Sequence, residues 1–327
     1  MALKVFQEQV RYKGWVGTEK LTLLYTTFTT LLLLVFWKKL ADPQSQLLLR
    51  MAVLSGIFLA VTIYRWRPSR ATLFLRQFWP LTLLSVWYPD TYEFCCLFPY
   101  QDHIFAAADA YFFGMQPSLV FNEVLSGKFW SELFHMGYFS YYPLILLTVV
   151  ASIFTKPSQF SRTSFIVLGS FFLYYVIYLF TPVAGPQYYF CATGLDCILQ
   201  GIYPEMGTYF RHCTEMLPSP GPHGFFHDLI VMTQASGERP TAAFPSSHVG
   251  ISTILMFLLY RDNRRLLWIA LPFYIFLCCA TVYIQAHYLV DVFGGFLSAI
   301  VIYTLTSRLY PWMTRTSPEF QLAVALP

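Results

Sequence analysis

The sequence predicts an all-α protein, a polytopic bundle of transmembrane helices. Of its 327 residues, 56% are hydrophobic and 12% are charged, whereas soluble domains average about 25% charged residues. The apolar residues fall in long runs rather than in alternating or striped patterns, which indicates lipid around the helices. The low charge and the aromatic content of 19% exclude an intrinsically disordered chain.

Eight stretches are apolar enough to cross a bilayer, which requires about 20 mainly apolar residues with their backbone groups satisfied within the helix. They are Leu21–Trp37, Leu47–Tyr64, Ala71–Tyr88, Tyr138–Thr155, Thr163–Thr181, Ser247–Tyr260, Leu266–Gln285 and Val292–Ser307. No short apolar core with a small-residue cleavage site precedes Leu21, so the first stretch is expected to be retained and not removed as a signal peptide.

Lysine and arginine residues predict which side of the membrane each connection faces. The short connections after the second, fourth and sixth stretches, together with both chain ends, carry fifteen of the 21 cations, and such cations mark the cytoplasmic side. The long connections at 89–137 and 182–246 are expected to face outward, because they carry only Lys128, Arg211 and Arg239. Three cations between the first two stretches count against this orientation: Lys38, Lys39 and Arg50.

Net charge and cysteine positions limit which ligands and covalent links the sequence allows. The charge of +4 follows from the topology, and no stretch has the basic density that binding to nucleic acid requires. Five of the seven cysteines lie in the outward connections, at Cys95, Cys96, Cys191, Cys197 and Cys213. Two interpretations stay open: a Cys191–Cys197 bridge, with Cys213 paired elsewhere, or free buried thiols. No cysteine spacing is typical of a zinc site.

The segment Pro245–Ser246–Ser247–His248 begins the sixth stretch. Proline and serine before an apolar run are typical of a helix N-terminus, whose unpaired N–H groups bind anions. His248 lies in the first turn, where its side chain can give a proton to a bound anion. The alternative is that a serine only caps the helix and that His248 is an interfacial polar residue.

His287 and Asp291, between the last two stretches, are four residues apart. On a helix, this spacing places them on one face. A carboxylate that holds one imidazole nitrogen leaves the other free as a base or nucleophile, although an interhelical hydrogen bond would explain the pair as well. The sixth and seventh stretches run in opposite directions, so the sequence predicts that His248 and His287 meet at one membrane face.

The two motifs, Pro245–Ser246–Ser247–His248 and His287–Tyr288–Leu289–Val290–Asp291, resemble the last two signature motifs of the type 2 phosphatidic acid phosphatase superfamily. The resemblance implies a six-helix core at residues 71–310, preceded by two N-terminal helices in residues 1–70 and followed by a cytoplasmic tail at 311–327. It also implies a phosphohistidine mechanism. His287 matches the nucleophile, Asp291 the residue that orients it, and His248 the acid that protonates the leaving oxygen.

Departures from the phosphatase motifs indicate the synthase-like branch of this superfamily. Ala280 and Thr281 stand where phosphatases have Ser-Arg, and Met232 stands where they have a lysine, although Arg239–Pro240 is present. Relatives that lack these cations include the inositol phosphorylceramide and sphingomyelin synthases. Residues 279–291 resemble the fungal inositol phosphorylceramide synthase motif, and residues 137–143 and 182–188 resemble bacterial proteins of this branch, notably from Bacteroidetes.

This resemblance implies a transferase that moves a phospho-head group, such as phosphoinositol from phosphatidylinositol, onto ceramide. The donor and acceptor are lipids of a bacterial inner membrane, the active site faces the non-cytoplasmic side, and no metal or cofactor is expected. A phosphodiester carries one negative charge where a phosphomonoester carries nearly two, so fewer cations suffice. One alternative is a lipid-phosphate or polyprenyl-diphosphate phosphatase, and another is a transporter in which the histidines relay protons.

Further residues are expected around the imidazoles. Candidates for phosphate binding are Ser246, Ser247, Arg239 and Gln187, with an exposed loop charge as the alternative for Arg239. Candidates for lining the substrate are Tyr188, Tyr142 and Tyr288. Four carboxylates are candidates for binding the head group, with ordinary solvated side chains as the alternative: Glu93, Asp102, Asp228 and Glu238.

Overall fold

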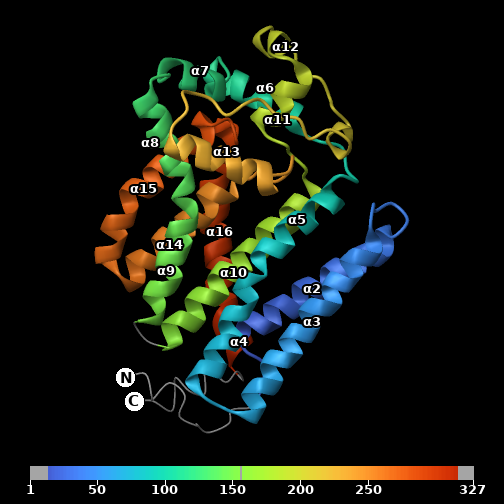
Figure 1. Ribbon diagram of the computed structural model, residues 1–327, viewed down its shortest axis with the longest axis vertical. Coiled ribbons are helices and arrows are strands. Elements are labelled where there is room, and N and C mark those ends of the chain that lie inside the picture. The colour runs from blue at the N-terminus through green and yellow to red at the C-terminus, as the bar shows by residue number, and fades with distance from the viewer. Residues whose placement is uncertain (1–13, 155–156, 316–327) are drawn as a thin grey trace. The chain divides into compact units, whose positions relative to one another are not determined.

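The computed structural model describes residues 14–154 and 157–315, apart from the side chains of residues 157, 158 and 236. Within these residues it contains α-helices and one short 3-10 helix, η1 (Tyr209–Arg211), and no strand (Figure 1). Six helical segments are long and apolar enough to span a membrane: Gly17–Phe36, Pro43–Trp66, Lys128–Ile153, Gln159–Phe180, Arg264–Tyr283 and Leu289–Thr314. The predicted all-α polytopic bundle is therefore confirmed. Lys4, Arg11, Lys13, Lys156 and the tail from 316 lie outside the described residues.

Two of the eight predicted stretches are not among these six. The stretch at 71–88 is divided into α4 (Arg70–Thr82) and α5 (Leu84–Cys95). Pro80 lies in α4 and Pro89 in α5, and a proline removes a helical hydrogen bond and crowds the preceding turn. The predicted sixth stretch is α14 (Ser247–Asp262), whose 16 residues extend about 24 Å, short of the about 30 Å hydrocarbon core.

The described residues fold as two compact units, and the first comprises residues 14–90, 149–154, 157–173 and 302–315. Its helices α2 (Gly17–Phe36), α3 (Pro43–Trp66) and α4 pack against one another (Figure 1). It also includes the first part of α10 (Pro157–Phe180) and the end of α16 (Leu289–Thr314).

Two buried ion pairs tie the helices of this first unit together. The guanidinium of Arg76 donates to both oxygens of Glu19 at 2.6 Å, and that of Arg50 donates to both oxygens of Asp90 at 2.8 and 3.1 Å. A buried charge is tolerated when it is paired in this bidentate way. Arg50 is only 1% exposed, so it is neutralised inside the protein and no longer counts against the predicted orientation.

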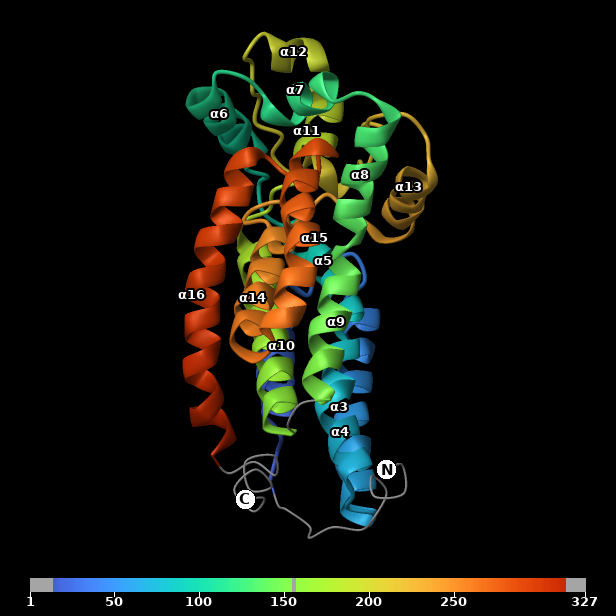
Figure 2. The ribbon, with the colours of Figure 1, turned by 90° about the vertical axis from the view of Figure 1, so that its left-hand side faces the viewer.

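The second unit comprises residues 91–148 and 174–301. Its helix α8 (Lys128–Phe139) packs against α13 (Phe225–Gly237) and α15 (Arg264–Tyr283), and α15 packs against α14 (Figure 2). Both long connections belong to this unit from residue 91 onward, and each contains several helices. Four short helices lie at the end of the unit where α15 ends and α16 begins: α6 (Asp102–Phe113), α7 (Pro117–Val124), α11 (Pro186–Thr193) and α12 (Leu195–Leu199).

The predicted fourth stretch begins ten residues earlier than expected, because α8 and α9 (Tyr141–Ile153) together form one apolar segment from Lys128. All seven cysteines are free thiols. Cys95 is buried and donates to the hydroxyl of Thr241 at 3.1 Å. Of the two interpretations left open by the sequence, the structure therefore has free thiols and no Cys191–Cys197 bridge.

Candidate active site

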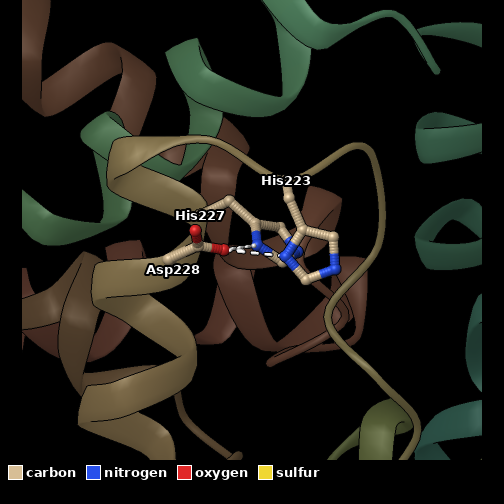
Figure 3. A group of neighbouring side chains, drawn as sticks. All are labelled: His223, His227 and Asp228. Carbon is tan, nitrogen blue, oxygen red and sulfur yellow. Dashed lines mark hydrogen bonds and ion pairs between the residues drawn. The ribbon is translucent and has the colours of Figure 1, made fainter.

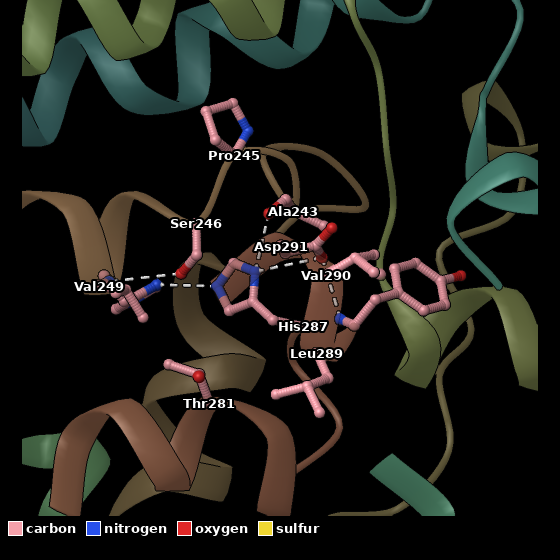
Figure 4. A network of polar contacts seen from close by, with 12 residues as sticks. Ala243, Pro245, Ser246, Val249, Thr281, His287, Leu289, Val290 and Asp291 are labelled. Carbon is pink, nitrogen blue, oxygen red and sulfur yellow. Dashed lines mark hydrogen bonds and ion pairs between the residues drawn. The ribbon is translucent and has the colours of Figure 1, made fainter. Parts of the chain in front are cut away.

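His287 lies in the loop that joins α15 to α16. Its backbone N–H donates to the carbonyl of Thr281 at 3.0 Å, and its side chain is 3% exposed. The ring nitrogen Nδ1 is 2.8 Å from the carbonyl oxygen of Ala243 (Figure 4). A carbonyl oxygen only accepts hydrogen bonds, so Nδ1 carries the proton. In the neutral ring, the lone pair is therefore on Nε2.

His248 is the second residue of α14, and its Nδ1 is 3.3 Å from Nε2 of His287. Since Nε2 of His287 has the lone pair, the N–H in this contact is supplied by Nδ1 of His248. The rings of Tyr138 and Tyr141 flank His248, with centroids 4.7 and 4.6 Å away. The predicted meeting of the two imidazoles is thus observed, and it has a defined donor and acceptor.

Asp291 lies beside Nδ1 of His287, as the sequence predicted, but it is not the hydrogen-bond partner of that nitrogen. Its Oδ2 is 3.6 Å from Nδ1 of His287, beyond hydrogen-bond length, and accepts the backbone N–H of Tyr288 at 2.9 Å. The prediction assumed that both residues lie on one helix, but α16 begins at Leu289, so His287 precedes the helix. The carbonyl of Ala243 orients the ring, and the fully buried Asp291 carboxylate faces the same nitrogen from slightly farther away (Figure 4).

Two other buried carboxylates position the His287 loop. The oxygens of Asp109 accept the backbone N–H groups of Leu289 and Val290, each at 2.9 Å. Asp102 accepts the amides of Ala184 and Gly185 at 2.9 and 2.8 Å. It also accepts the hydroxyl of Tyr288 at 3.1 Å. Asp102 is therefore fully engaged inside the fold and is withdrawn as a head-group ligand.

Gly185 brings the segment before α11 against the His287 loop. It has a φ of +96°, a conformation that side-chain-bearing residues rarely adopt. A Cβ at this position would lie 2.6 Å from the carbonyl oxygen of Ala286. A glycine is therefore required for this close approach of two backbones beside the imidazole.

The first backbone N–H groups of α14 and of α16 have different hydrogen-bond acceptors. The unpaired N–H groups of a helix N-terminus attract anions. At α16 the protein supplies the anion itself, through Asp109 and Asp291. At α14 the hydroxyl of Ser246 accepts the amide of Val249 at 3.3 Å, and the first two amides, of Ser247 and His248, have no acceptor within the helix. The start of α14 thus has two backbone N–H groups that can bind an anion.

Backbone strain is concentrated beside these residues. Among the described residues, two that are not glycine have a positive φ, Ala242 at 71° and Gln285 at 64°. Ala242 precedes the carbonyl that orients His287, and Gln285 lies two residues before the imidazole. Strained backbone of this kind costs of order 1–3 kcal/mol and is concentrated at functional sites.

The residues predicted to bind phosphate differ in their surroundings. Ser246 caps α14, as the alternative interpretation held, and Arg239 is exposed. The amide of Gln187 donates to Leu217 at 2.6 Å and accepts from Gln234 at 3.0 Å, so its role in phosphate binding stays a prediction.

The predicted tyrosines differ in exposure. Tyr288 is fully buried and Tyr188 is 4% exposed, whereas Tyr142 is 52% exposed. The aromatic rings that contact His248 are those of Tyr138 and Tyr141. The hydroxyl of Tyr288 donates to Asp102, and the role of Tyr288 in lining the substrate stays a prediction.

The expected role of His287 as nucleophile gives a testable pH dependence. Burial lowers the pKa of His287 to about 4, against the hydrogen bond to Ala243, which raises it. The ring is thus neutral, with its lone pair available, at every pH well above 4. We expect the rate of phosphoenzyme formation, measured by rapid quench, to stay level from pH 7 to about 5 and to fall only near pH 4. An acid limb at about 6.5, the ordinary histidine value, would contradict this.

Sequence comparison assigns this region to a known family. A family model, described as the PAP2 superfamily, matches residues 103–305. The matched segment begins in α6 and ends in α16, so it contains both imidazoles and the buried carboxylates of Asp109 and Asp291. No curated protein and no solved structure matches the chain.

Proposed function

Because the chain belongs to the PAP2 superfamily, we propose that it is a lipid phosphotransferase that moves phosphoinositol from phosphatidylinositol onto ceramide and releases diacylglycerol. Membership supports an integral membrane enzyme of the lipid phosphatase or phosphotransferase type. The observation that carries the proposed mechanism is the contact between Nδ1 of His248 and Nε2 of His287. It supplies a nucleophilic lone pair and a proton donor at the start of α14.

The first chemical step uses both rings. A phosphodiester bound at the start of α14 takes the place of the imidazole contact, and its negative charge favours the imidazolium form of His248. Nε2 of His287 attacks phosphorus while the bond from phosphorus to the diacylglycerol oxygen breaks, and His248 gives that oxygen its proton. The products are phosphohistidine, neutral His248 and diacylglycerol.

The second step reverses these roles. Neutral His248 takes the proton of the primary hydroxyl of ceramide, and the ceramide oxygen attacks phosphorus. The bond from phosphorus to Nε2 of His287 breaks, which restores the neutral nucleophile and the protonated acid. Tyr138 and Tyr141, whose rings both contact His248, form an aromatic surface that favours a lipid hydroxyl over water.

The charges around the imidazoles support a diester donor. Among the described residues, no lysine or arginine side chain hydrogen-bonds to His248, His287 or Asp291. Thr281, at a position where phosphatases have arginine, is buried and contributes its backbone carbonyl to the His287 loop. Met232, at the lysine position, is 70% exposed. A singly charged phosphate needs less compensation than a phosphomonoester.

One carboxylate candidate for the head group remains near the predicted lining tyrosines. Burial raises the pKa of Glu238 to about 7. Burial also raises the pKa of Tyr188, and the Glu238 carboxylate adds to that rise. A carboxyl that is half protonated at neutral pH both donates to and accepts from hydroxyl groups. We assign Glu238 to the inositol ring of the donor.

The orientation of the second unit supports an active site on the non-cytoplasmic face. Arg261, at the end of α14, lies about 20 Å along the helix from His248, and Arg264 and Arg265 follow at the start of α15. Positive residues mark the cytoplasmic end. The imidazoles are at the other end of the same helix pair, and a bacterial inner membrane is the proposed location.

The function is tested by following the phosphate of the donor. The full-length protein in detergent micelles is mixed with phosphatidylinositol labelled at phosphorus, with and without ceramide, and the products are separated by thin-layer chromatography. We expect label in inositol phosphorylceramide only when ceramide is present, and none with the His287→Ala variant. Release of water-soluble inositol phosphate, whether or not ceramide is present, would instead identify a phosphatase and refute the transferase.

A further inference from the structure

Three side chains with metal-binding atoms meet at the start of α13 (Figure 3). They are His223, His227 and Asp228, and their ligand atoms all lie within 4.8 Å of one another. Oδ1 of Asp228 is 2.8 Å from Nδ1 of His223 and 3.0 Å from Nδ1 of His227. Three atoms of two histidines and one aspartate thus converge on one point.

The hydrogen bonds of His227 indicate that a positive charge, a proton or a metal ion, belongs at this point. Its Nε2 is 3.3 Å from the carbonyl oxygen of Ser219, and because a carbonyl only accepts, Nε2 carries the proton. The lone pair of the neutral ring is therefore on Nδ1, which faces the carboxylate oxygen of Asp228 at 3.0 Å. Two electron-rich atoms this close repel each other unless a positive charge compensates them. The side chain of His227 is 3% exposed, so water does not screen this contact.

Ser219, whose carbonyl contacts His227, is held in place by His135. Nδ1 of His135 donates to the carbonyl of Ser131 at 2.6 Å, so Nε2 of His135 accepts the hydroxyl of Ser219 at 2.9 Å. Ser131 also donates to the carbonyl of Pro222 at 3.0 Å. The loop that carries His223 is in this way anchored to α8. A backbone carbonyl that fixes the non-coordinating nitrogen of a histidine is a regular feature of metal sites.

We propose that Nδ1 of His223, Nδ1 of His227 and Oδ1 of Asp228 bind one divalent transition-metal ion of the zinc type. Two imidazoles and one carboxylate are a ligand set that suits zinc, with a water molecule in the fourth position. Tetrahedral zinc needs ligand atoms about 3.3 Å apart, so the three atoms separate by a few tenths of an ångström. His223 has the freedom to do this, because its side chain is 83% exposed.

The ion has a structural role and takes no part in the phosphoryl transfer. It links His223, in the loop before α13, to His227 and Asp228 in the first turns of that helix. The amides of Phe226 and His227 are bound by Glu132 of α8 at 3.1 and 3.0 Å. Since no disulfide joins this outward connection, the ion takes the place of a covalent link between the loop and α13.

The test measures binding of Zn²⁺ alone to tag-free full-length protein in detergent micelles. The protein is stripped with a chelator, its thiols are blocked, and Zn²⁺ is titrated in competition with a chromophoric chelator. We expect one ion per chain, with affinity lowered about tenfold or more by His223→Ala and by Asp228→Asn. Zn²⁺ should also raise the midpoint of thermal unfolding of the wild type and not of His223→Ala.

The control is His212→Ala, which removes another exposed histidine of the same connection and should leave the affinity for Zn²⁺ unchanged. His223 and Asp228 are both largely exposed, so their replacement does not disturb the core. Wild-type protein that binds no Zn²⁺ would overturn the proposal. So would an affinity that is the same in His223→Ala, Asp228→Asn and the wild type, because the ion would then be bound elsewhere.

Discussion

Replacing His287 with alanine is expected to abolish turnover and to leave no phosphoenzyme. The residue supplies the lone pair on Nε2, and its Nδ1 proton is fixed by the carbonyl of Ala243 at 2.8 Å. Loss of a covalent nucleophile lowers rates by about 10⁴-fold or more. The intermediate is measured by incubating the enzyme with a phosphorus-labelled lipid donor, quenching in alkali and detecting acid-labile label on the protein.

The matched comparison is His248→Ala, which removes the acid and leaves the nucleophile. We expect it to slow transfer from the lipid donor by about 10²–10⁴-fold, and to slow transfer from a nitrophenyl phosphodiester much less, because nitrophenolate departs without a proton. A packing role for His248, between the rings of Tyr138 and Tyr141, would affect both donors equally. Retention of activity by both alanine variants would refute the phosphohistidine mechanism.

The meeting of the two histidines was predictable because it depends on short local patterns. A helix start at Ser246 and a second motif at His287 are brought to one face by two antiparallel helices, α14 and α15. Antiparallel order follows from the short connection between them, in which α15 begins two residues after Asp262. Nothing about distant contacts was needed for this part of the prediction.

The group that orients His287 was not predictable from residue types. It is the backbone carbonyl of Ala243, and every residue has such a group. The supporting carboxylate of Asp109 contacts residues 180 positions away in the sequence, and an aspartate in an apolar segment can equally cap a helix or form an ion pair. Such contacts are fixed by tertiary packing, so the sequence pattern around each residue contains no signal for them.

Two further differences between prediction and structure concern residues that were visible in the sequence but were judged by hydropathy and charge alone. The predicted third stretch is divided at Leu83, three residues after Pro80, and hydropathy does not register the loss of a backbone donor at a proline. Arg50 was counted as a positive residue that marks the cytoplasmic side, but it is buried in a bidentate ion pair with Asp90. In that case the relevant partner is 40 residues away, and only the fold shows that the two side chains meet.

Asp291→Asn is expected to separate catalysis from stability at this site. The carboxylate of Asp291 is fully buried, and its Oδ1 has no hydrogen-bond partner among the described residues. Its Oδ2 is 3.6 Å from Nδ1 of His287. When Nε2 forms a bond to phosphorus, the ring acquires positive charge. A negative carboxylate at this distance in a buried site stabilises that charge.

Asparagine keeps the shape of the side chain and an oxygen that accepts the N–H of Tyr288, but it removes the negative charge. We therefore expect phosphoenzyme formation to slow by about 10²–10⁴-fold, comparable to the loss of a charged partner of a catalytic histidine. The midpoint of thermal unfolding should stay the same or rise, because the variant no longer buries an incompletely bonded charge. Rapid-quench kinetics and thermal unfolding in the same detergent measure the two effects.

The control for this prediction is Asp109→Asn, which should lower the stability of the protein, whereas Asp291→Asn should lower the rate. Both oxygens of Asp109 accept backbone N–H groups, from Leu289 and Val290, so an amide would place an N–H donor against one of them. The loss of a buried acceptor costs about 1–3 kcal/mol of stability. A destabilised Asp291→Asn variant with an unchanged rate would show that Asp291 only holds the start of α16, and that the carbonyl of Ala243 is sufficient for the chemistry.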